Sequence, residues 1–556
     1  MTRQLSPSSS PEALRREAKR WYKDLCAGDL AARDRLTAAW PAAPGNGWAL
    51  RDVQHALARE YAHTDWNALM LTAQERRAER ELARQSHAER VDTLLRHGWN
   101  GDVLTARRIA ARFFEVRAHD LLTAVTCGEM DIVRALLADN TATATATGGP
   151  QEWTALAHVA YGRVDDVNAV AIAQLLLDAG ADPRFAFDDG WGNAFTLVTG
   201  AIGQGEGAKR THPQARELVA LLLSRGADPY DLQALYNTSI VHDDITWTAM
   251  LWSHCERAGR TGEWRDATGR SLGGSFGLCT LDYLLGNAVA QNHLQRASWL
   301  LEHGADARTL HAYSRQPVHT MAVLAGYDRM AALLGEHGAE MEELDGERAL
   351  VAALMRGDDQ EVRVRIAADP ALVRSAAPLI AAATHDRADG VRLLVSLGAN
   401  VNALDHDGAT SLHRAAHAGA LQAIEVLLEA GATVDVRDRK WKGTPMSWAC
   451  ALGRTLVAER LAPLTYDVRA LARTARVERL EEVLRERPHL SNERLAGVDE
   501  PTPLFCLPPD EDDALEVVRL LLAYGADRSA RDGRARTPAD VARAKGMTVV
   551  AAVLAG

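Results

Sequence analysis

The chain has 556 residues, of which 47% are hydrophobic and 25% are charged, and its formal net charge is −11. This length exceeds what a single hydrophobic core can support, so we expect several domains or an array of repeats. The composition is that of a folded chain. The acidic balance without a dense basic patch argues against a nucleic acid as the partner.

The N-terminal part has no long-range repeat. Its first ten residues are rich in serine and predict a disordered tail over residues 1–10. Residues 11–118 predict several helices, which we assign to an N-terminal helical domain. We favour the interpretation that this domain caps the apolar face of the segment that follows it. An independent binding module is the alternative.

The cysteines and the hydropathy pattern bear on where the protein acts. The six cysteines are scattered and form no Cys-x-x-Cys pair, which argues against a disulfide framework and favours a reducing cytoplasm. The N-terminus has no apolar stretch of signal-peptide length, and no segment approaches the roughly 20 apolar residues that cross a bilayer. We therefore expect a soluble, cytoplasmic protein without a membrane partner.

After residue 119 a tripeptide recurs that consists of glycine, alanine and an acidic or amide residue. The step from Gly304 to Gly338 is 34 residues, and the step from Gly398 to the near miss at Gly431 is 33 residues. Such a constant step indicates a repeat architecture. The complete tripeptide begins at Gly180, Gly226, Gly304, Gly338, Gly398 and Gly525.

A leucine-rich helix is predicted before each of these glycines. Before Gly431, the residues Ile424, Leu427 and Leu428 follow the spacing i, i+3, i+4 and therefore share one face of a helix. Glycine can then end the helix in the left-handed conformation. Each unit is too small to bury its own apolar face, so neighbouring units are predicted to stack.

The start of the unit also has a signature. Residues 410–416 read Thr-Ser-Leu-His-Arg-Ala-Ala and resemble the Thr-Pro-Leu-His-x-Ala-Ala motif of ankyrin repeats. Weaker versions begin at Gln316, Thr444, Thr502 and Thr537. From about residue 119 the chain resembles ankyrin repeat proteins, and its N-terminal part resembles the leader of large bacterial ankyrin proteins of unassigned role.

This resemblance implies an all-α ankyrin-repeat solenoid with an N-terminal helical cap domain. It also implies that the signature histidines, His413 and His319, serve the scaffold. We predict irregular repeats over residues 119–347, with long insertions at 184–213 and 242–279, and more regular repeats over residues 348–556. We expect an irregular backbone from His242 to Cys279.

Insertions and hairpin loops of a solenoid often form its binding face. We therefore predict a scaffold that binds another protein through its concave face and finger loops, using residues of the types that dominate interfaces. The acidic chain favours a partner of basic or mixed charge. For the tryptophans the alternative is that they fill gaps between imperfect repeats. The candidate binding residues are Trp153, Trp191, Trp247, Trp264, His406, Asp407, His417, Arg439 and Trp441.

Two further hypotheses remain at this point. The apolar C-terminal segment, residues 548–555, has little polar cover and could mediate self-association. The second hypothesis is an enzyme or small-ligand binder with a pocket under the insertions at 184–213 and 242–279.

For this enzyme, imidazole and carboxylate groups would act as general acid and base or ligate a metal. Solvated loop residues are the alternative. No metal-ligating motif is present, so we predict no metal and no cofactor. The weak catalytic candidates are His242, Asp243, Asp244 and His254.

Overall fold

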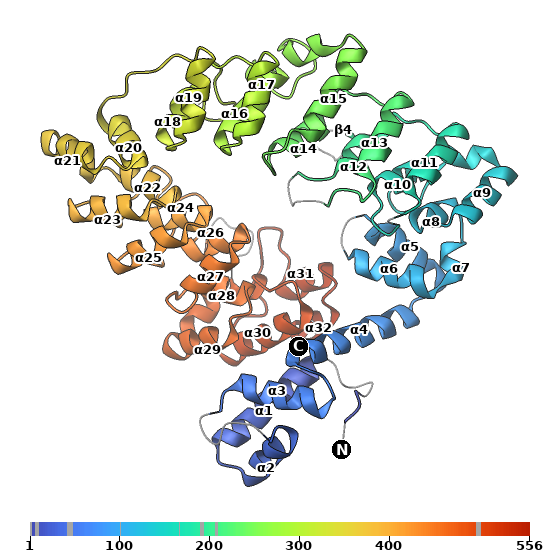
Figure 1. Cartoon of the computed structure of the whole chain (residues 1–556). Helices are drawn as coiled ribbons and strands as arrows, with labels where there is room; N and C mark the ends of the chain where they lie inside the picture. The colour runs from blue at the N-terminus through green and yellow to red at the C-terminus, as the bar shows by residue number, and fades with distance from the viewer. Residues whose placement is uncertain are drawn as a thin grey trace. The chain divides into compact units, whose positions relative to one another are not determined.

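Figure 1 shows the computed structural model of the chain. The structure describes residues 3–5, 11–41, 48–99, 102–165, 167–188, 194–205, 210–495 and 502–556. In these residues helices dominate, and the strands form two short antiparallel hairpins. The chain divides into two compact units, Met1–Leu284 and Leu285–Gly556. The predicted all-α repeat fold is confirmed.

The first unit begins with helices that form two separate apolar clusters. One cluster contains Trp21, Leu57 and Leu69, and the other contains Leu94 and Ile109. Helix α5 packs against α8 (Leu121–Thr126), which fits a cap over the following repeats. These helices are α1 (Pro11–Cys26), α2 (Leu30–Ala39), α3 (Leu50–Glu60), α4 (Trp66–Arg84), α5 (His87–His97), α6 (Val103–Arg112) and α7 (Phe114–Arg117).

Arg3 lies in the segment expected to be disordered, yet it has defined partners. Its backbone nitrogen donates to the Glu60 carbonyl oxygen (2.7 Å), and its guanidinium pairs with Glu17 and Glu60. The structure thus attaches residues 3–5 to the first apolar cluster, whereas residues 1, 2 and 6–10 lie outside the described residues.

The rest of the first unit consists of helix pairs that stack in chain order. The first helix of each pair contacts the first helix of the next pair, in the order α8, α10, α12 and α14. The second helices of the pairs, α9, α11 and α13, also contact one another in turn. The elements are α9 (Met130–Asp139), η1 (Thr141–Ala144), β1 (Thr147–Gly148), β2 (Trp153–Thr154), α10 (Ala155–Tyr161), α11 (Ala169–Asp178), β3 (Ala186–Asp188), β4 (Ala194–Thr196), α12 (Leu197–Ile202), α13 (Ala215–Ser224), α14 (Leu232–Ser239), α15 (Thr246–Arg257), η2 (Thr261–Arg265) and η3 (Gly274–Phe276).

The second unit continues the same pattern after α16 (Thr280–Ala290), with α18, α20, α22, α24, α26 and α28 in successive contact. Its elements are α17 (Leu294–Glu302), α18 (Val318–Leu324), α19 (Asp328–Glu336), α20 (Gly346–Arg356), α21 (Asp359–Ala368), η4 (Leu372–Arg374), α22 (Ala376–Thr384), α23 (Ala388–Ser396), α24 (Ser411–Ala418), α25 (Leu421–Glu429), α26 (Pro445–Ala451), α27 (Thr455–Leu461), α28 (Val468–Arg473), α29 (Val477–Glu486), η5 (Pro488–Asn492), η6 (Pro503–Phe505), α30 (Glu511–Ala523), α31 (Pro538–Ala544) and α32 (Thr548–Ala555).

Where the recurring glycines occur, they end the second helix of a pair as predicted. Gly431 has φ +85°, and the backbone nitrogen of Ala432 donates back to the Leu427 carbonyl oxygen (2.9 Å). This bond can form only if Gly431 has a left-handed backbone conformation. A residue with a Cβ would be strained in that conformation. The six glycines of the complete tripeptide also have positive φ.

The first helices begin at the predicted threonine and proline signals. His413 lies in α24, and its Nδ1 accepts from the Thr410 backbone nitrogen (3.0 Å). Its other ring nitrogen, Nε2, therefore donates to the Gly443 carbonyl oxygen of the next repeat (3.2 Å). His413 is buried and links two repeats, in keeping with its expected structural role. His319 is also buried.

Residues 242–279 are more regular than the sequence analysis expected. They contain α15, which buries Trp247, Leu251 and Trp252. Gly259 ends this helix at φ +69°, and the Arg260 backbone nitrogen bonds to the Cys255 carbonyl oxygen (2.8 Å). The segment is thus the second helix of a pair followed by two 3-10 turns, and the prediction of an irregular run is wrong for α15.

The C-terminal helix α32 uses its apolar residues internally. Val550, Ala551 and Leu554 are buried, and α32 packs against α30 and α31. Val549 is the large apolar side chain of this helix that stays half exposed. This packing accounts for most of the apolar character on which the self-association hypothesis depended.

None of the helices in the described ranges is both long enough and apolar enough to cross a bilayer.

Aromatic side chains from several repeats meet in the first unit. Trp153, which is 2% exposed, has its ring centroid 4.9 Å from those of Trp99, Tyr161 and Phe187. Trp153 is therefore a core residue that joins neighbouring pairs.

We predict that Trp153→Ala lowers the free energy of unfolding by about 3–5 kcal/mol, because it leaves a cavity among four aromatic rings. Trp441→Ala, at a side chain that is 54% exposed, should change it by less than about 1 kcal/mol. Urea denaturation followed by circular dichroism measures both. Equal midpoints for the two variants would contradict the buried position of Trp153.

Buried histidines make stability depend on pH. Burial lowers the pKa of His158 to about 4, and its Nε2 has no hydrogen-bond partner among the described residues. The unfolded chain takes up this proton near pH 6.5, whereas the folded chain does so only near pH 4. Stability is therefore lost as the pH falls through this window, by up to about 3 kcal/mol.

We predict that His158→Phe, which conserves an aromatic ring beside Trp153, reduces the loss of unfolding free energy between pH 7 and pH 5. Urea titrations of both proteins at the two pH values measure this difference. An identical pH dependence in the variant would show that His158 is not held neutral by burial.

Candidate binding surface

Five of the candidate binding residues lie on two neighbouring loops and the helix between them. We name residues 402–410 the first finger and residues 435–444 the second finger. His406 and Asp407 lie in the first finger, His417 lies at the end of α24, and Arg439 and Trp441 lie in the second finger. All five belong to the second unit.

The two fingers are in direct contact. The Arg439 backbone nitrogen donates to the Asp407 carbonyl oxygen (2.7 Å). Gly408 has φ +75°, and a Cβ at this position would lie 2.6 Å from Cγ of Arg439. Glycine is therefore required there both by the left-handed backbone and by the approach of the second finger.

The second finger is organised around the buried carboxylate of Asp438, which is 1% exposed. Its Oδ1 accepts from the backbone nitrogens of Lys440 (2.8 Å) and Trp441 (2.6 Å). Its Oδ2 accepts from the Gly443 backbone nitrogen (2.8 Å) and from Nε1 of Trp448 (3.1 Å). Burial raises the pKa of Asp438, but these donors outweigh it, and the net pKa is lowered. Asp438 thus stays ionised and holds the loop.

Trp448, at the start of α26, forms the base of the surface. Its ring centroid lies 5.3 Å from that of Trp441 and 5.9 Å from that of His417. The Arg414 guanidinium lies 5.3 Å from the same ring. Trp448 is buried, and the sequence did not indicate that it supports Trp441.

Arg414 neutralises the carboxylates of the first finger. Its Nε donates to Asp405 (2.9 Å) and its Nη2 to Asp407 (3.0 Å). His406 is exposed, and its Nε2 lies 3.4 Å from Asp407. Asp405, His406 and Asp407 are close enough to share a metal ion, but the guanidinium already occupies both carboxylates. We therefore assign no metal to this group.

The remaining tryptophan candidates do not join this surface. Trp153, Trp247 and Trp264 are 2%, 8% and 0% exposed. Trp264 packs against Trp252 (5.2 Å between ring centroids) inside the first unit. These three residues therefore fill the core, and their prediction as binding residues is wrong. Trp191 lies outside the described residues.

The catalytic candidates lie directly before α15 and on it. Asp244 accepts from the backbone nitrogen and hydroxyl of Thr246, at the start of α15, while His242 and Asp243 are exposed. His254 lies on α15, where burial and Arg257 lower its pKa. In the described part of the chain, the group of His, Cys, Asp or Glu side chains close enough to hold one metal ion is Asp405, His406 and Asp407 of the first finger.

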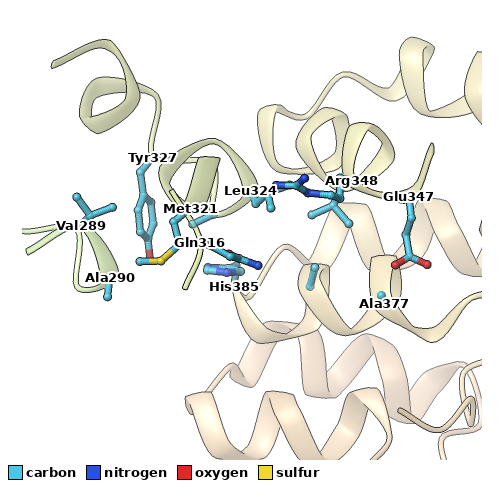
Figure 2. A pocket seen from close by; sticks show the side chains of 13 residues that line it. Val289, Ala290, Gln316, Met321, Leu324, Tyr327, Glu347, Arg348, Ala377 and His385 are labelled. Atoms are coloured by element: carbon cyan, nitrogen blue, oxygen red, sulfur yellow. The ribbon is translucent and has the colours of Figure 1, made fainter. Parts of the chain in front are cut away.

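Figure 2 shows an open groove of about 450 Å³ along the helices α16, α18, α20 and α22. Met321 and Tyr327 lie on one side of it and Glu347 and Ala377 on the other, with His385 between them. The lining is mainly apolar. It comes from residues 289–385, so this groove is not the pocket expected under the insertions at 184–213 and 242–279.

Comparisons with known proteins agree with this architecture. A family described as ankyrin repeats (3 copies) matches residues 360–438 and 379–472. E3 ubiquitin-protein ligase KEG of Arabidopsis thaliana is 28% identical over 215 residues, which are 36% of this chain and 12% of the relative. Ankyrin repeat and SOCS box protein 16 of Homo sapiens is 28% identical over 167 residues, 30% of each chain.

Protein PhlB of Serratia liquefaciens is 32% identical over 130 residues, which are 22% of this chain and 57% of the relative. The chain thus spans less than two thirds of the length of each of these three relatives. The family match contains both fingers and the helices α22 to α27. Ankyrin repeats generally mediate protein–protein interaction through their extended surfaces. With its stacked helix pairs, glycine helix ends and signature histidine, the chain contains ankyrin repeats, to which the family model matches within residues 360–472.

Proposed function

We propose that this protein is a scaffold that binds a protein partner through the two fingers and the adjacent concave face of α24 and α26. The observation that supports this function most is the position of Trp441. Its indole is 54% exposed, although the ring contacts Trp448 and the loop that carries it is held by Asp438. A large aromatic side chain held at the surface is typical of an interface hot spot.

The fixed geometry of the loop favours tight binding. Association loses free energy when loops and side chains must be ordered on contact. In the second finger, the backbone at Lys440, Trp441 and Gly443 is already bonded to one carboxylate. The link from Arg439 to Asp407 fixes the two fingers relative to each other. A partner can therefore engage both fingers without ordering either.

The enzyme alternative has less support, because the groove of Figure 2 is lined by residues 289–385 and not by the insertions that carry His242, Asp244 and His254. We also propose that the protein acts in the cytoplasm of a bacterium. The six cysteines are free in the structure, which fits a reducing compartment. The N-terminal resemblance to the leader of bacterial ankyrin proteins fits this source.

We predict that Trp441→Ala reduces capture of the native partner from a host extract by at least roughly tenfold, the effect of losing a hot-spot tryptophan. The matched control is Tyr313→Ala, which removes an exposed aromatic ring from another loop of the same unit. Quantitative mass spectrometry of proteins retained on the immobilised full chain measures capture.

Both variants should keep the circular dichroism spectrum and melting temperature of the original protein. Equal retention of every specific partner by Trp441→Ala, Tyr313→Ala and the original chain would rule out the second finger as the binding surface.

A further inference from the structure

The tip of the second finger carries three exposed positive charges. Arg439, Lys440 and Lys442 are exposed, and none of them forms an ion pair with a described residue. Other arginines of the same unit do have carboxylate partners, as in the pairs of Arg460 with Glu425. Three unpaired cations within four residues are therefore a local feature of this loop.

The acidic groups near these cations are already engaged. Asp438 is buried and accepts hydrogen bonds from the loop backbone and from Trp448. Asp405 and Asp407 are paired with Arg414. Because these carboxylates are occupied, the exposed charges at the tip are positive, although the whole chain carries −11.

A further exposed arginine lies near the end of α24. Arg454 is exposed, and its Nε donates to the His417 carbonyl oxygen (3.0 Å). Burial, together with the guanidinium groups of Arg414 and Arg454, lowers the pKa of His417. The end of α24 thus lies beside the guanidinium groups of Arg414 and Arg454.

An apolar surface lies between these charges. Nζ of Lys440 lies 4.5 Å from the centroid of the Trp441 ring, so the ring is bordered by a cation while about half of its area stays exposed. Lys442 follows Trp441 and has a left-handed φ of +56°, so the chain turns at this residue. The tip thus offers a half-exposed indole with the cation of Lys440 against its ring and two more exposed cations within the same four residues.

We propose that the second finger binds an acidic segment of a protein partner, in which carboxylates flank an aromatic or aliphatic side chain. The carboxylates pair with Arg439, Lys440 and Lys442, and the apolar side chain covers Trp441. This inference rests on the proposed function and specifies the chemistry of the partner. It reverses the charge expected from the whole chain, because a partner meets the charge of the contact surface and not the net charge.

A nucleic acid is the competing polyanion, since bases can stack on an exposed tryptophan. It fits less well. A nucleic acid backbone carries regularly spaced phosphates beyond the fingertip, and these would meet an acidic chain. A short acidic peptide can place its few carboxylates on the three cations alone.

The test is a selection from a display library of short random peptides on the immobilised full chain, with Trp441→Ala as the counter-selection. We expect the enriched peptides to be acidic and to contain an aromatic or large aliphatic residue. Their binding should weaken as the salt concentration rises, since it depends on exposed charges.

The charge variant combines Arg439→Gln, Lys440→Gln and Lys442→Gln, and we expect it to weaken these peptides by at least roughly tenfold. The control combines Arg329→Gln, Arg363→Gln and Lys545→Gln, which removes the same charge from exposed positions elsewhere in the unit and should leave binding unchanged. Lys440→Gln alone serves as the milder variant if the triple variant unfolds.

The outcomes separate this inference from the proposed function. Enrichment of neutral or basic peptides that require Trp441 would overturn the acidic specificity and leave the binding surface intact. Tighter binding of a single-stranded oligonucleotide through the same three cations would also overturn it. A selection without any Trp441-dependent peptide would contradict the proposed function itself.

Discussion

The structure depends on the apolar interface between consecutive helix pairs. A pair such as α24 and α25 buries Leu412, Ile424 and Leu427, and it does so only because α22 and α26 cover it on either side. Each pair therefore lacks a complete core of its own, and stability is shared between neighbours. This constraint places most of the apolar packing in the helices, so that exposed loop positions such as Trp441 can be used for recognition.

Polar links reinforce the apolar interface at the same end of the pairs. Asp467, at the start of α28, accepts from the hydroxyls of Thr444 and Ser447 at the start of α26 (2.7 Å each). In the first unit, Asp231 at the start of α14 accepts hydrogen bonds from the hydroxyls of Thr196 and Thr199 at the start of α12. The residue that caps one helix thus also receives bonds from the cap of the preceding repeat. This arrangement fixes the finger ends of the first helices, from which the loops project.

The sequence predicted the repeat and missed contacts that depend on distant residues. Gly398 and Gly431 could be recognised because a helix end needs a left-handed residue at a fixed position. Trp153 precedes a capping threonine, as a finger residue should, but Tyr161 and Phe187 from the same and the next repeat enclose it. The helix α15 was missed because Arg260, and not alanine, follows its final Gly259, although the apolar spacing of Trp247 and Leu251 was visible.

Trp441 was recognised as a surface residue for a local reason. Its neighbours Lys440 and Lys442 cannot be buried without partners, so the indole between them had to lie near solvent. The role of Asp438 could not be read in the same way, because an aspartate in a loop is ordinarily solvated. Its burial follows from Nε1 of Trp448, ten residues further along the chain. This contact joins the loop to the helix that follows it, and residue spacing alone does not reveal it.

The second finger is also tied to a part of the chain well beyond its own repeat. Arg437 donates through Nη2 to Glu493 (2.9 Å) and through Nη1 to the Lys442 carbonyl oxygen (3.1 Å). Two repeat interfaces, α26 on α28 and α28 on η6, separate the loop from this anchor in the stack. A displacement at either interface would act on Arg437 and, through Lys442, on the turn that carries Trp441. The arrangement of repeats on one side of the finger therefore bears directly on how its indole is held.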